Sequence, residues 1–138
     1  MAPGNDAISA LVPHRPPILR LQQIIAATPE FAETAGHEPM SGGLPWELGA
    51  IEGLAQTAAV LHGQHHPPLA EAPAGMLVGL RRFTFHRAPC PGAALRYRIE
   101  LVRRLGPAVL VAGRASADGV VYAEGELKLW NPEPASPG

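Results

Sequence analysis

The chain is poor in the features that mark several classes of protein. Its 138 residues include one cysteine, Cys90, so no intrachain disulfide can form, which fits a reducing compartment. Eleven basic and twelve acidic side chains leave a formal net charge of −1, which gives little electrostatic support for binding nucleic acid. No segment approaches the roughly 20 apolar residues that span a bilayer, and no signal peptide is recognisable. We therefore predict a cytoplasmic protein with no membrane or nucleic-acid partner.

The length suits one ordinary domain with a real hydrophobic core. Proline and polar residues are concentrated at both ends, in residues 1–9 and 131–138, where we expect flexible tails. Between the tails there is neither an internal repeat nor a convincing linker. Residues 10–130 are therefore predicted to form a single domain.

Apolar periodicity predicts two strands, one helix and then more strands. Residues 18–28 and 31–38 are expected as strands. A helix should open after Ser-Gly-Gly-Leu-Pro and end near Gly63, with Ser41 as a possible cap and Pro45 suited to the first turn. Alternating residues, with turn signals at 106–107 and 118–119, predict antiparallel strands over 75–87, 94–106, 107–117 and 120–130.

The predicted helix is apolar over much of its surface, so it needs a sheet able to cover most of that surface. A strongly curved antiparallel sheet of about five or six strands, wrapped around one long central helix, meets this need. The fold class predicted from the pattern is therefore α+β.

One carboxylate interrupts the apolar helix. Glu52 shares a helical face with Leu48, Ala55 and Gln56. Burial disfavours the ionised form of a carboxyl group, which would suit a general acid or base near neutral pH. The spacing is equally compatible with a Glu52 at the edge of the apolar stripe that reaches water.

Small residues precede the helix. Backbone N–H groups without an intrahelical acceptor lie at this positive end of the helix. Such an end can stabilise a carbonyl oxygen that becomes negative during a reaction. A pair of glycines before a helix is also common in plain turns, so this signal alone is weak.

Three segments resemble the hotdog-fold β-hydroxyacyl-acyl-carrier-protein dehydratases. LVPHRPPIL at 11–19 is similar to an N-terminal segment in which a Pro-His pair precedes an apolar strand, and 75–101 resembles the strand pair after the family's helix. GAIEGLAQTAAVL at 49–61 is similar to the central helix, where an acid precedes an Ala-Gln pair. LPWELGAIEGLAQ looks closest to the predicted dehydratases of aryl polyene pigment synthesis. The resemblance implies the hotdog fold.

It also implies dehydration of a 3-hydroxyacyl thioester to a trans-2-enoyl thioester. Glu52 matches the acidic member of the family's His/acid pair, and His37 is the nearest candidate for its base. His14 also matches a family position, where the resemblance implies a structural role, and is the alternative base. His37 and Glu52 are one residue further apart than in the family, and Glu38 stands where an apolar residue is expected. Residues expected at the substrate are Leu44, Trp46, Glu47, Leu48 and Gln56.

The resemblance implies an acyl-carrier-protein or CoA thioester as substrate and no metal or organic cofactor. In this family the two catalytic groups usually come from different subunits, so the resemblance further implies at least a homodimer, or a heterodimer with another hotdog dehydratase. Two other functions stay open: a hotdog thioesterase in which Glu52 activates water, and a non-catalytic hotdog subunit.

Two further clusters have ordinary explanations. His62, His65 and His66 have spacing that could bind zinc, but two prolines follow them and a polar loop is favoured. Five arginines could form a basic rim for an acidic carrier protein, or could lie on solvated strand faces: Arg81, Arg82, Arg87, Arg103 and Arg104.

Overall fold

The computed structural model describes residues 20–41, 43–65 and 76–130. The elements follow the predicted order: β1 (Gln23–Ala27), β2 (Phe31–His37), α2 (Trp46–His65), β3 (Met76–Phe85), β4 (Ala94–Leu105), β5 (Ala108–Ala117) and β6 (Val120–Trp130). Both predicted tails, His14 and the loop at 66–75 lie outside the described residues.

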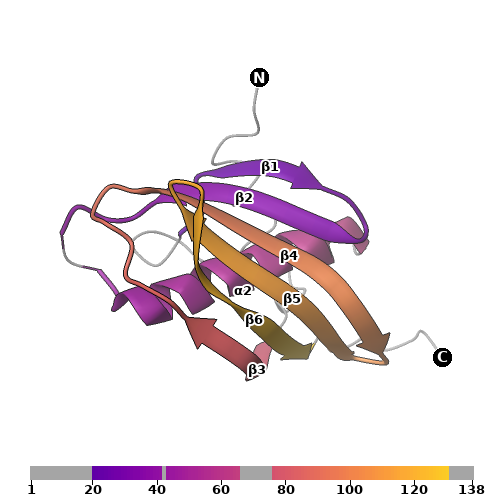
Figure 1. The fold of residues 1–138 in the computed structure, drawn as a ribbon. Coiled ribbons are helices and arrows are strands. Elements are labelled where there is room, and N and C mark those ends of the chain that lie inside the picture. The colour runs from indigo at the N-terminus through magenta and orange to yellow at the C-terminus, as the bar shows by residue number, and fades with distance from the viewer. Residues whose placement is uncertain (1–19, 42, 66–75, 131–138) are drawn as a thin grey trace.

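The six strands form one antiparallel sheet in the order β1-β2-β4-β5-β6-β3. Figure 1 shows that this sheet is curved and that α2 lies across one of its faces. The helix packs mainly against β4, β2 and β5. A curved sheet around a central helix is the predicted hotdog arrangement.

The predicted turns hold the strands in register. Asp118 and Gly119 both have left-handed φ angles, of 49° and 85°, and join Ala117 to its partner Val120 in a two-residue hairpin. Gly106, with φ 58°, turns the chain between β4 and β5. The alternation in β4 predicts Leu95, Tyr97, Ile99 and Leu101 as inward residues; the first three are fully buried, whereas Leu101 is only half-buried.

The start of the helix differs from the prediction. Pro45 lies just before α2, and its carbonyl accepts the Gly49 N–H at 2.9 Å. Pro45 therefore occupies the cap position rather than the first turn, and Ser41 is too far from the helix to cap it. The helix also extends to His65, beyond Gly63.

One face of α2 carries the core contacts. Ala50, Leu54, Val60 and Leu61 are at most 3% exposed, whereas Leu48 is 52% exposed. Gly53 lies against the ring of Tyr97, with no room there for a Cβ, so the helix approaches β4 closely at this point. Glu52, the residue before Gly53, is only half-buried.

Candidate active site

Glu52 is bound by the side chain one helical turn further on. The Gln56 Nε2 donates to Glu52 Oε2 at 3.2 Å, and Gln56 is itself fully buried. The Arg20 main-chain N–H donates to Gln56 Oε1 at 2.7 Å. Because a main-chain N–H can only donate, it fixes the amide with its oxygen toward Arg20 and its NH₂ toward Glu52. Gln56 therefore holds one carboxyl oxygen of Glu52 as an acceptor.

His37 is the last residue of β2, and its side chain is exposed. Its Nδ1 lies 2.8 Å from Gln22 Oε1. With that oxygen as the acceptor, a neutral imidazole carries its proton on Nδ1 and has a free lone pair on Nε2. A histidine in this tautomer can accept a proton at Nε2.

Next to His37, a buried ion pair joins the segment before β1 to the end of β2. Arg20 Nη2 lies 3.0 Å from Glu38 Oε2, with side chains only 7% and 12% exposed. The same Nη2 lies 3.5 Å from the Tyr97 hydroxyl. Burial alone would lower the pKa of Arg20, but Tyr97 and Glu38 outweigh it and raise the pKa of the guanidinium above its ordinary value.

Two buried tyrosines complete this cluster. Burial raises the pKa of Tyr97 above its ordinary value. Burial also raises the pKa of Tyr122, and the neighbouring Tyr97 adds to the effect. Both hydroxyls therefore stay neutral at physiological pH.

Sequence reasoning missed the roles of Gln22, Arg20 and the two tyrosines. The available signal was an arginine inside the apolar run Ile18–Leu21, together with the unexpected Glu38. The sequence does not indicate that these two residues are partners, because 18 positions separate them in the chain.

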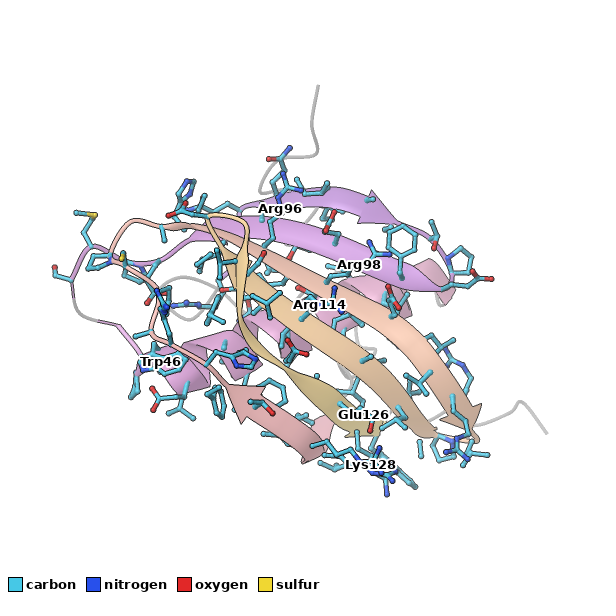
Figure 2. The ribbon with its side chains drawn as sticks, in the orientation of Figure 1. Trp46, Arg96, Arg98, Arg114, Glu126 and Lys128 are labelled. Carbon is cyan, nitrogen blue, oxygen red and sulfur yellow. The ribbon has the colours of Figure 1, made fainter. Side chains whose placement is uncertain are left out.

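The helix start presents free donors close to aromatic side chains. In any α-helix the first N–H groups lack an intrahelical acceptor, which here concerns Trp46, Glu47 and Leu48. The Trp46 ring meets Phe85 edge-on at 5.7 Å and Tyr122 at 6.2 Å between centroids. Figure 2 shows Trp46 where α2 begins, next to β3. Leu44 and Leu48, also expected at the substrate, are exposed.

The described arginines on the strands are largely exposed, and several have acidic neighbours. Arg81 lies 3.9 Å from Glu126, and Arg98 lies 2.8 Å from Glu100. Figure 2 shows Arg96, Arg98 and Arg114 along β4 and β5. Within the described parts of the chain, no group of three or more His, Cys, Asp or Glu side chains could hold a metal ion. His66 and the side chain of His65 lie outside the description.

Comparison with known proteins identifies the family. The family model of ApeP-like dehydratases matches residues 6–137. The chain belongs to the ApeP-like dehydratase family. It is 32% identical over 148 aligned residues to a 3-hydroxyacyl-[acyl-carrier-protein] dehydratase FabZ of Solibacter usitatus, covering 96% of this chain and 90% of that one. The FabZ of Helicobacter pylori is 30% identical, with coverages of 89% and 87%.

A solved structure agrees on the fold of this ApeP-like dehydratase. The dehydratase heterocomplex ApeI:P from Xenorhabdus doucetiae matches with a TM-score of 0.77 and 24% identity, over 91% of each chain. The family match and the FabZ relatives confirm the predicted activity, dehydration of a 3-hydroxyacyl thioester, at the level of the family. None of the helices in the described residues is long and apolar enough to cross a membrane.

Proposed function

We propose that this ApeP-like dehydratase acts on a carrier-protein-bound 3-hydroxyacyl thioester, with His37 as the base and Glu52 as the acid. The observation that carries the proposal is the fixed hydrogen bond from Gln56 to Glu52, on a helix that is otherwise apolar. Since Oε2 accepts that bond, the catalytic proton of Glu52 belongs on Oε1.

The reaction is an elimination of water. His37 Nε2 removes the proton from the carbon next to the thioester carbonyl, and the electron pair moves to form the new double bond. The carbonyl oxygen gains negative charge, which the N–H groups at the start of α2 stabilise. Glu52 Oε1 gives its proton to the departing hydroxyl, which leaves as water. The products are a trans-2-enoyl thioester and water.

The first test measures hydration and dehydration of an enoyl thioester presented on acyl carrier protein and on CoA. We expect Glu52→Gln and His37→Ala each to lower kcat at least 100-fold, because general acid–base catalysis contributes about 10²–10⁴-fold. Glu100→Gln and His86→Ala, both on exposed side chains, are the matched controls. Full activity in His37→Ala would overturn the base assignment, with His14→Ala tested next. Release of free thiol in place of the enoyl product would favour a thioesterase.

We also propose that the site is completed by a second hotdog subunit, of the same chain or of another dehydratase. The support is an apolar face at the start of the helix that the described chain leaves uncovered: Leu44 and Leu48 are 37% and 52% exposed. The structural neighbour ApeI:P is a heterocomplex of dehydratases. Activity that appears only with a co-expressed hotdog dehydratase would identify the hetero-oligomer.

Light scattering tests the association itself. Leu48→Glu places a charge on the uncovered face and should lower the measured mass toward that of a monomer. Val102→Glu, at 50% exposure on β4, is a matched control that should leave the mass unchanged. An unchanged mass in Leu48→Glu would place the interface elsewhere.

A further inference from the structure

The segment Arg20–Gln22 contacts His37 directly and Glu52 through Gln56. The Arg20 main chain binds Gln56, which binds Glu52. The Arg20 side chain binds Glu38, the residue after His37. Gln22 binds the imidazole of His37 itself. We propose that Arg20 is a positioning residue of the dehydratase, which holds the His37 and the Glu52 of its own chain each in the orientation that the reaction needs. This inference rests on the proposed function.

The guanidinium is enclosed by residues that leave it little freedom. A Cβ at Gly49 would lie 2.9 Å from Arg20 Nη2 and 3.0 Å from its Cζ, so a larger residue there would displace the guanidinium. A Cβ at Gly36 would collide with the Arg20 carbonyl oxygen. Glycines on both β2 and α2 thus allow Arg20 to lie between the two elements that carry His37 and Glu52.

The Glu38 end of the ion pair is equally well fixed. Its N–H donates to the Ala93 carbonyl at 2.9 Å, and its carbonyl accepts the Gly92 N–H at 2.9 Å. His37 pairs with Ala94 in the sheet. With the main chain held by residues 92–94 and the Glu38 side chain held by Arg20, the backbone of His37 has one well-defined position.

A buried ion pair is weak evidence for stability, because desolvation offsets much of the attraction between the charges. Well-packed apolar residues often replace such a pair without loss of stability. What apolar residues cannot replace is the directed contact from Arg20 toward Glu38 and Tyr97. This separates a positioning role, which affects turnover, from a structural role, which affects folding.

The experiment therefore removes both charges together, in Arg20→Leu/Glu38→Leu, so that neither is left buried and unpaired. The matched control is Arg98→Leu/Glu100→Leu, which makes the same changes at an exposed ion pair on β4. Thermal unfolding, kcat and KM are measured for both variants, beside wild type and Glu52→Gln. Arg20→Lys, which keeps the charge but loses the planar fork, tests partial rescue.

We expect the Arg20→Leu/Glu38→Leu variant to remain folded, with kcat lowered at least 10-fold and KM within about twofold, since small misplacements at an active site are costly in rate. The control pair should keep wild-type kcat, and Arg20→Lys should fall between. Wild-type kcat in a folded Arg20→Leu/Glu38→Leu variant would overturn the inference. If that variant does not fold, Arg20→Lys decides, and its unchanged kcat would overturn the inference.

An activity-independent readout separates this inference from the proposed function. Ring nitrogen shifts of His37, measured by NMR in histidine-labelled protein, should differ between wild type and Arg20→Leu/Glu38→Leu but not in the control pair. Unchanged shifts would overturn the positioning role even if wild type shows no dehydratase activity. Active wild type, inactive Glu52→Gln and a fully active Arg20→Leu/Glu38→Leu variant would leave the proposed function intact and remove only the role of Arg20.

Discussion

Gly53 of the helix lies directly against the ring of Tyr97 on β4, with no space between them for a side chain. This contact places α2 on the sheet and sets which helical face is buried. Glu52, the residue before Gly53, lies at the edge of that face and is half-buried beside the fully buried Gln56.

Gly53→Ala should therefore destabilise the fold by about 1–3 kcal/mol, because overpacking outweighs the usual gain of replacing a helical glycine. Urea denaturation measures the free energy of unfolding. At Gly79 an added Cβ meets nothing within 4 Å, so Gly79→Ala is the control and should stay within about 0.5 kcal/mol of wild type. A Gly53→Ala protein as stable as wild type would contradict the close packing.

Gln56→Leu should lower both stability and turnover. It leaves the Arg20 N–H without its acceptor, which costs about 1–3 kcal/mol, and it removes the donor that holds Glu52. Thr57→Val is the control, since it breaks the buried 2.9 Å contact with Thr34 without touching Glu52. Both variants should lose stability, but only Gln56→Leu should lose kcat. Equal kcat in the two would mean that Gln56 has no role in orienting Glu52.

Most of the fold could be predicted because its signals are local. Alternation in 94–101 predicts the inward residues Leu95, Tyr97 and Ile99 correctly and fails only at Leu101, which is half-buried. Asp118-Gly119 marks its hairpin by turn chemistry alone. The start of the helix was harder, because proline suits the first turn of a helix, yet Pro45 lies one position before it. The buried face of the helix was harder to predict, because its residues are apolar nearly all round, and close contacts such as that of Gly53 with Tyr97 form only in the folded sheet.

In the candidate site, too, local contacts could be predicted from the sequence and contacts between distant residues could not. Glu52 and Gln56 are one helical turn apart, so their pairing follows from helical spacing. Arg20 contacts Glu38, Gln56 and Tyr97, which are distant in the chain and are brought together only by the folded sheet. An arginine in an apolar run signals an unusual position but does not identify its partner.

The β5–β6 hairpin offers a test of backbone strain. Asp118 has φ 49°, and its Oδ1 accepts the Ala94 N–H at 3.1 Å. Asp118→Ala loses this bond and keeps a left-handed φ that costs a non-glycine residue about 1–2 kcal/mol. Asp118→Gly loses the bond but relieves the strain. The unfolding free energies should therefore place Asp118→Gly above Asp118→Ala, and the reverse order would argue against a left-handed residue 118.

Tyr122 should make the protein sensitive to alkali. Its hydroxyl is buried without a hydrogen-bond partner among the described residues, and burial raises its pKa above the ordinary 10.0. Above pH 10 the unfolded chain releases this proton while the folded chain keeps it. The contribution of Tyr122 to the unfolding free energy is therefore fully present below pH 10 and falls as the pH rises further.

Tyr122→Phe removes the hydroxyl that titrates. Between pH 10 and 11 its unfolding free energy should fall by about 1 kcal/mol less than that of wild type, while at pH 7 the two should agree within about 1 kcal/mol, since no hydrogen bond is lost. Tyr97→Phe is the comparison, because its hydroxyl lies 3.5 Å from Arg20 and its loss should cost more at pH 7. Denaturant titrations at each pH measure both effects. Parallel decline of wild type and Tyr122→Phe above pH 10 would show that Tyr122 titrates alike in the folded and unfolded chains.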